Sequence, residues 1–248
     1  MKFCVLTLFP ELFDPFWNHG IIRRAVQGKK INPVTINIRD HAKGRHRVTD
    51  DRPYGGGCGM VMKPEPLTAA LAEAKIGMPS ATTLLLSPQG KRFDQPLAQS
   101  LASEGGLILV CGRYEGVDER FVDRHVDGEI SIGDFVLTGG ELAAMVVIDA
   151  VARLIPGVLG NEDSAGSDTF CDGLVEHAHF TRPPTFEDEP VPDVLLSGNH
   201  QEIERWRRET ALMRTVMKRP DLLAQREFSP QERDILVKWR RDIDRLIG

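Results

Sequence analysis

Three short stretches of the 248-residue chain end a strand-like apolar run in glycines and polar residues. They are LLLSPQGKRFD at 84–94, LVCGRYEGVDER at 109–120 and SIGDFVLTGGELAAM at 131–145. Glycine at the end of a strand lets backbone amides and carbonyls approach a flat ligand closely. Because open parallel sheets bind ligands beyond the carboxyl ends of their strands, we expect the three turns to converge on one binding site.

Phosphate binding is not the chemistry that these turns favour. The chain lacks the G-x-x-x-x-G-K-[ST] pattern, and TLFPELF rather than G-x-G-x-x-G follows the first apolar strand. The pattern instead predicts a nucleotide-like cofactor held without a phosphate cradle. A single glycine at a turn usually marks only a turn, so it is the succession of three that indicates a pocket.

The histidines and cysteines give weaker indications of a functional site. His177 and His179 could share a strand face, but two histidines without a third ligand seldom make a metal site, so we expect none. The cysteines are widely scattered with no C-x-x-C pair, which predicts free thiols. They are Cys4, Cys58, Cys111 and Cys171.

Composition is that of an ordinary globular protein, with 41% hydrophobic residues and a formal net charge of -5. No apolar run approaches the roughly 18 to 20 residues that a membrane span needs, and MKFCVLTLFPELF reaches Glu11 too soon for a secretory segment. We therefore expect a cytoplasmic protein with no membrane contact. Residues 23–52 hold nine Lys/Arg against three Asp, which gives either a surface for an RNA backbone or a solvated basic face.

The first 155 residues alternate apolar runs with amphipathic segments. The runs at 2–9, 34–38, 81–87 and 106–112 are short and rich in aliphatic residues, as in a sheet that is buried on both faces. The segments between and after them look helical, at 16–26, 66–74, 95–103 and 141–154. This alternation predicts an α/β fold with a mainly parallel sheet.

The residue composition changes near residue 161. NEDSAGSD is small and polar, and TRPPTFEDEPVPD is rich in proline and acid with neither a strand nor a helix period. Two helices are predicted beyond them. The first, at 197–217, places Ile203, Trp206, Thr210, Met213 and Met217 on one face. The second, at 229–247, opens with a capping box of Ser229 and Glu232. The expected organisation is an α/β domain at 1–160, a flexible loop at 161–173 and a small helical domain at 174–248.

Six motifs carry a resemblance to a known family. They are DDRPYGGGCGM (50–60), LSPQG (86–90), CGRYEGVDER (111–120), SIGDFVLTGGE (131–141), HFTRP (179–183) and LLSGNH (195–200). In this order and spacing they closely resemble the bacterial tRNA (guanine-N1)-methyltransferases, a family of the SPOUT methyltransferases. The match spans nearly the whole chain. It departs where Cys58, Leu85, Phe135 and Ala143 replace the expected Pro, Tyr, Tyr and Pro.

The resemblance implies a deep trefoil knot in the α/β domain, with S-adenosylmethionine (SAM) bound inside it. Sequence patterns alone would not suggest a knot, because true knots are very rare. The implied cofactor-binding residues are Leu86, Ser87, Pro88, Gly112, Tyr114, Glu115, Gly116, Ile132, Gly133, Leu137, Gly139 and Gly140. Glu115 has three open roles: to position substrate, to bind a Mg²⁺ ion, or only to cap the helix that starts near Val117.

Methyl transfer to guanine N1 needs a group that removes the N1 proton, because the protonated nitrogen is a poor nucleophile. By resemblance that general base is Asp168, donated by the other subunit of a homodimer whose active site lies at the subunit interface. Arg153 resembles the arginine that supports guanine O6 as negative charge develops. Without the resemblance, Asp168 would be one acidic residue in a polar loop, and Arg153 would be a cation that the helix dipole favours at a helix C-terminus.

The resemblance thus predicts an enzyme that methylates N1 of the guanine immediately 3′ of the tRNA anticodon and so maintains the reading frame. The helical domain, with 12 Lys/Arg and nine Asp/Glu in residues 199–248, would grip the anticodon arm. Two alternatives stay open. One is a SPOUT methyltransferase acting on ribosomal RNA, and the other is a non-catalytic RNA-binding module.

Overall fold

The computed structural model describes residues 1–160, 169–170, 172–224 and 226–248. The chain divides into two compact units, Met1–Glu162 and Asp163–Gly248. Each unit is described by itself. Within the described residues, no helix is long and apolar enough to cross a membrane.

A five-stranded, fully parallel sheet forms the centre of the first unit, with strand order β2-β1-β6-β5-β7. Its strands are β1 (Lys2–Thr7), β2 (Asn32–Asn37), β5 (Thr82–Arg92), β6 (Gly106–Cys111) and β7 (Gly128–Ser131). The α/β class and the mainly parallel sheet predicted from the sequence are confirmed. Every residue of β6 is buried, which explains why this strand is a continuous apolar run rather than an alternating one.

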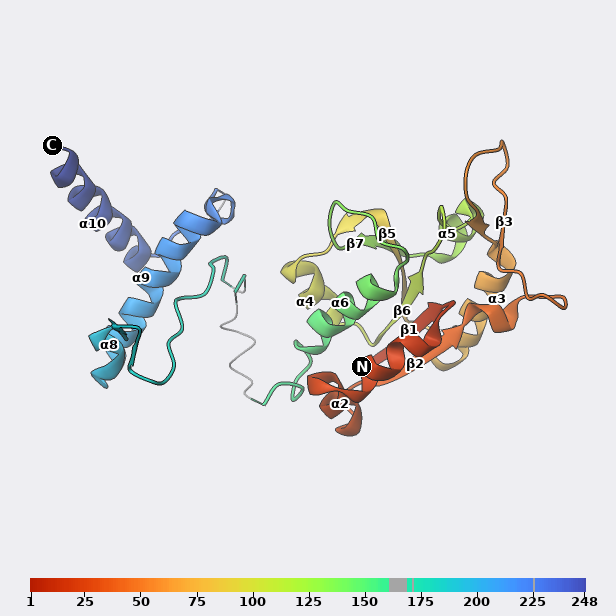
Figure 1. The fold of residues 1–248 in the computed structure, drawn as a ribbon, viewed down its shortest axis with the longest axis horizontal. Coiled ribbons are helices and arrows are strands. Elements are labelled where there is room, and N and C mark those ends of the chain that lie inside the picture. Colours follow the sequence, from red (N-terminus) through yellow and green to blue (C-terminus); the bar gives the residue numbers. More distant parts are fainter. Residues whose placement is uncertain (161–168, 171, 225) are drawn as a thin grey trace. The chain divides into compact units, whose positions relative to one another are not determined.

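Helices cover both faces of the sheet (Figure 1). They are α1 (Asp14–Asn18), α2 (Gly20–Gln27), α3 (Pro64–Gly77), α4 (Gln95–Ala102), α5 (Glu119–His125) and α6 (Glu141–Ala152). Phe3 and Val5 belong to the core cluster that contains α2, α4 and α6, whereas Cys4 and Leu6 belong to the cluster of α3 and α5. The period of two along a strand therefore divides the core into two layers.

Shorter elements connect these layers. They are the 3₁₀ turns η1 (Pro10–Phe13) and η2 (Ile38–His41) and the strands β3 (Asp50–Asp51) and β4 (Val61–Met62). The single helix expected at 16–26 is interrupted, because the backbone of His19 is extended after α1 and Gly20, the first residue of α2, has a φ of +60°.

The second unit is built on two helices, α9 (His200–Lys218) and α10 (Pro230–Ile247). Its smaller elements are β8 (Thr185–Phe186), β9 (Glu189–Pro190), α8 (Asp193–Leu196) and η3 (Pro220–Leu223). The two-residue hairpin of β8 and β9 corrects the expectation that TRPPTFEDEPVPD contains no strand. Its turn residues, Glu187 and Asp188, both have a positive φ, which a search for strand periodicity does not detect.

The buried face of α9 differs from the predicted one. Met213 and Met217 are exposed, whereas Ala211, Leu212 and Thr215 are buried. Leu212 packs in a cluster with Leu174 and with Ile235 of α10, so contacts with distant segments select the buried stripe. The capping box at the start of α10 is present as predicted.

Candidate functional site

The three glycine turns lie at one edge of the sheet and enclose a single cavity of about 350 Å³. Its lining residues come from β5, from the loop after β6, from β7 and the loop that follows it, and from the first turns of α5 and α6. All twelve residues predicted to bind a cofactor, from Leu86 to Gly140, line it. The volume lies in the range of small-molecule sites, roughly 300 to 1,000 Å³. The expected convergence of the turns is therefore observed, and the binding of a cofactor there stays a prediction.

Gly140 stands where two of the turns are in backbone contact. A Cβ atom added to it would lie 2.8 Å from the Cα of Cys111 and 3.0 Å from the Cβ of Leu86. Its amide donates a hydrogen bond of 2.9 Å to the carbonyl of Gly112. Since 2.8 Å is closer than real Cβ contacts come, no side chain fits here unless the turns move apart.

The backbone of the second turn is strained. Tyr114, whose side chain is 49% exposed, has a φ of +60°, and Gly116 follows with a φ of +135°. A bulky residue in this region costs on the order of 1 to 3 kcal/mol, and such residues gather at binding sites. The turn is held by a hydrogen bond of 2.9 Å from the Glu115 amide to the carbonyl of Met60.

Glu115 does not cap the neighbouring helix. The N-cap of α5 is Asp118, whose carboxylate accepts from the Arg120 amide. Hydrogen bonds from the Arg120 side chain, and secondarily from its amide, hold the pKa of the Asp118 carboxyl below its ordinary value, against the effect of burial. The Glu115 side chain instead packs over Gly59 of the glycine-rich loop. The capping alternative for Glu115 is therefore wrong, and the positioning of substrate and the binding of Mg²⁺ stay as the two other predicted roles.

A buried ion pair beneath the cavity was not predicted. Glu141, 2% exposed at the start of α6, is bound by the Arg113 guanidinium at 3.0 Å and by the Thr7 hydroxyl at 2.8 Å. The carboxylate thus joins β1, the second turn and α6, and its buried charge is compensated. In the sequence Glu141 is indistinguishable from an acid favoured at a helix N-terminus, because both partners are distant along the chain.

Thiol and metal chemistry find no support in the described part of the chain. Burial raises the pKa of the Cys111 thiol well above its ordinary value, and that of Cys4 to about 12. Cys4, Cys58 and Cys111 are free, and Cys171 lies outside the described residues. No three histidine, cysteine or acidic side chains among the described residues gather as a metal site would require. The possible Mg²⁺ ion is thus unsupported.

The two predicted catalytic residues do not line the cavity. Arg153 is the C-cap of α6, whose N-cap is Gly140. A helix of 12 residues is about 18 Å long, so Arg153 and the cavity lie at opposite ends of α6. Asp168 lies outside the described residues.

Comparison with known proteins places this chain in a family. The profile of tRNA (Guanine-1)-methyltransferase TrmD matches residues 1–225. The chain belongs to this family. Relatives include proteins named tRNA (guanine-N(1)-)-methyltransferase from Geobacter sulfurreducens, 57% identical with 98% of this chain and 99% of the relative covered, and from Desulfatibacillum aliphaticivorans, 54% identical with 100% and 94% covered. A third, from Geotalea uraniireducens, is 54% identical with 97% and 98% covered.

The departures expected from the tRNA (guanine-1)-methyltransferase pattern have different surroundings. Leu85 and Ala143 are buried and contribute to the cavity wall. Phe135 is 54% exposed at the cavity, where its ring covers Gly133. Cys58 is exposed in the glycine-rich loop and does not line the cavity. The first three can therefore alter contacts within the site, and Cys58 cannot do so directly.

Proposed function

We propose that this member of the tRNA (guanine-1)-methyltransferase family transfers the methyl group of SAM to N1 of the guanine immediately 3′ of the tRNA anticodon. Modification at that position would maintain the reading frame. The observation that carries the proposal is the convergence of all twelve expected cofactor residues on one cavity. The relatives' names supply the substrate. No specific observation favours ribosomal RNA or a non-catalytic module instead.

The cavity is suited to SAM because glycine-bearing turns bring backbone amides and carbonyls to its walls. A Cβ atom on Gly139 would collide with the side chains of Arg113 and Glu141, and one on Gly140 with Cys111 and Leu86, so the turns can pack this closely only with glycine. When bound, SAM supplies an activated methyl group on a sulfonium centre. The protein's own task is to orient the acceptor and to move one proton.

A trefoil knot would account for the tight crossing of the cavity loops. β5 pairs with β7 at two registers, Leu86 with Ile130 and, after a register shift within the strand, Lys91 with the same Ile130. Between them, a Cβ atom added to Gly90 would lie 2.4 Å from the backbone of Glu129 and Ile130. This intimate contact of two chain segments supports the proposal that the chain passes through a loop of its own backbone there.

In the proposed reaction, the carboxylate of Asp168 accepts the proton of guanine N1. Negative charge that develops on O6 as the proton leaves is met by the guanidinium of Arg153. The N1 lone pair then attacks the methyl carbon while the bond from that carbon to the sulfonium sulfur breaks, and S-adenosylhomocysteine departs with the bonding pair on sulfur. A positioned general base typically contributes about 10² to 10⁴ in rate. The identity of both residues rests on the family resemblance.

The position of Arg153 supports a homodimer with composite sites. Leu142 and Val146 form an exposed apolar stripe along α6, 59% and 46% exposed. If two copies packed antiparallel along this stripe, each would bring its Arg153 to the other's cavity. We propose that Arg153 and Asp168 both reach the cavity from the partner, because one chain's Arg153 lies about 18 Å along α6 from its own cavity.

Subunit complementation is expected to show which subunit supplies Asp168 and Arg153 to a given cavity. A Gly140→Val chain paired with an Asp168→Ala chain should recover up to about half of the wild-type methyl transfer to tRNA, because one of the two sites then receives an intact cavity and an intact Asp168. Arg153→Ala paired with Asp168→Ala should recover nothing, since each site then lacks one partner residue. The measurement is labelled methyl incorporated into tRNA by purified mixed dimers.

Two outcomes would contradict the arrangement. No recovery in verified dimers of the first pair would place the whole site within one chain. Recovery in the second pair would mean that Arg153 serves the cavity of its own chain while Asp168 serves the other.

A further inference from the structure

A buried carboxylate organises the second unit. Glu232 in the first turn of α10 is 1% exposed and accepts two hydrogen bonds of 2.9 Å from the guanidinium of Arg226. It also closes the capping box, accepting from the Ser229 amide at 2.8 Å. Burial acts to raise the pKa of this carboxyl, but the bonds from Arg226 and Ser229 outweigh it and hold the pKa below its ordinary value. Glu232 is therefore ionised at neutral pH.

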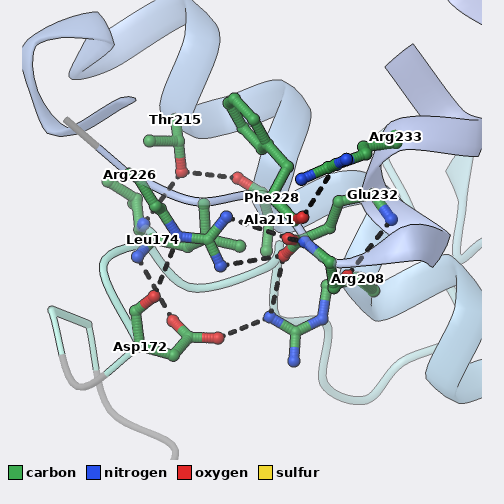
Figure 2. Close-up of polar contacts among 11 residues, drawn as sticks. Asp172, Leu174, Arg208, Ala211, Thr215, Arg226, Phe228, Glu232 and Arg233 are labelled. Carbon is green, nitrogen blue, oxygen red and sulfur yellow. Dashed lines mark hydrogen bonds and ion pairs between the residues drawn. The ribbon is translucent and has the colours of Figure 1, made fainter. Parts of the chain in front are cut away.

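Two arginines, Arg208 and Arg226, connect Glu232 to Asp172, which comes before α8 and α9 in the sequence (Figure 2). Arg208 of α9 donates through Nη1 both to Glu232, at 3.4 Å, and to the carboxylate of Asp172. Arg226 donates through Nε to the backbone carbonyl of Asp172 at 3.0 Å. Asp172 is thus held by its side chain and by its backbone, on two different arginines.

The residues around Asp172, here called the anchor segment (169–176, with 171 not described), are folded onto the helices. The Thr169 hydroxyl donates to Glu176 at 3.2 Å, and the Phe170 amide donates to the Leu174 carbonyl at 3.0 Å. Leu174 is 2% exposed in the core of the unit. The next residue in the chain is also held, because the Val175 amide donates to the hydroxyl of Thr215 in α9 at 2.9 Å. The anchor segment is therefore a part of the helical unit.

The Arg208–Asp172 pair is not needed to satisfy the buried charge. Arg226 and Ser229 already occupy both oxygens of Glu232. The side chains of Arg208 and Asp172 are 41% and 49% exposed, and ion pairs this accessible contribute little to stability. The pair joins the side chain of Asp172 in the anchor segment to α9.

We infer that Arg208 and Asp172 are positioning residues for methyl transfer: they fix the segment that begins beside the proposed base to α9. Thr169 follows Asp168 directly in the chain. The inference rests on the proposed function, in which Asp168 removes the N1 proton.

The test is single-turnover methyl transfer by the full-length protein at saturating SAM and tRNA. Arg208→Ala and Asp172→Ala should each slow the chemical step by about tenfold or more, because displacement of a catalytic group by about 1 Å can cost 10²-fold. SAM affinity and unfolding temperature should stay unchanged. Asp172→Ala removes a negative charge and so loses no attraction to the RNA backbone, which separates positioning from RNA binding.

Arg207→Ala is the matched control. Arg207 neighbours Arg208 on α9 and pairs only with Glu204 among the ion pairs found in the described residues. Its single-turnover rate at saturating tRNA should stay within about twofold of wild type, as for an exposed pair of little energetic consequence.

Combination with Asp168→Asn distinguishes positioning from a general structural role. Once the base is gone, Arg208→Ala should slow the reaction no further, because both changes act on the same proton transfer. Multiplied effects, single variants within about twofold of wild type, or a lowered unfolding temperature that accompanies the slowing would overturn the inference. Failure of the proposed function would show separately, as a wild-type protein that leaves guanine N1 unmethylated or an Asp168→Asn variant as fast as wild type.

Discussion

Asp168→Asn is expected to slow single-turnover methyl transfer to tRNA by about 10²-fold or more, the scale of a lost general base. Asparagine keeps the size of the side chain and much of its hydrogen bonding, but it has no carboxylate to accept the N1 proton. Binding of SAM and tRNA should therefore survive. The measurement is the rate of the first turnover at saturating concentrations of both substrates.

The pH dependence gives an independent check of the same assignment. Raising the pH deprotonates a growing fraction of guanine N1 without help from the protein, so the deficit of Asp168→Asn should shrink at alkaline pH. A merely structural Asp168 would instead weaken binding or stability and leave the chemical step nearly unchanged. A rate within a few-fold of wild type at neutral pH would rule out this base, and Glu115 would be the next carboxylate to test.

Gly140→Val is expected to abolish SAM binding while the secondary structure persists. A Cβ atom at this position would lie 2.8 Å from the Cα of Cys111 and 3.0 Å from the Cβ of Leu86. The two methyl groups of valine would need still more space. The second and third turns would separate, and the cavity between them would lose its shape. Isothermal calorimetry with SAM measures the loss, and circular dichroism reports the fold.

Gly105→Val provides the matched control for that experiment. Gly105 precedes β6 outside the cavity lining, and a Cβ atom added to it meets nothing within 4 Å. Its SAM affinity should match that of the wild type. If Gly140→Val also kept its full affinity, the cofactor would have to bind elsewhere on the protein.

The sheet and the cavity were largely predictable because their signals are local. Burial of β1 and β6 on both faces leaves continuous apolar runs. Glycine marks the turns, at Gly140 because backbone leaves no room for a Cβ atom and at Gly133 because φ is +150°. Loops at the carboxyl ends of neighbouring parallel strands then meet of necessity. The fold class and the gathering of the three turns followed from these features alone, whereas the identity of the cofactor came only from the family motifs.

Apart from the short β8–β9 hairpin and the break before α2, the missed features depend on contacts between residues far apart in the sequence. Glu141 is an ordinary first-turn acid until the fold brings Arg113 and Thr7 to it. Met213 and Met217 looked as suitable for burial as Leu212, and only the packing of Leu174 and Ile235 decides between the faces of α9. The bond from Arg208 to Asp172 spans 36 residues. No local pattern encodes a partner at such a separation.

Mapping the methyl group on tRNA tests the central claim most directly. Unmodified tRNA carrying guanine immediately 3′ of the anticodon would be incubated with the protein and isotopically labelled SAM, digested with nuclease and sequenced by mass spectrometry. The account predicts one label, on that guanine, with the methyl at N1 in the released nucleoside. A label on another nucleotide or another ring atom, or tRNA that stays unlabelled while the protein binds SAM, would contradict it.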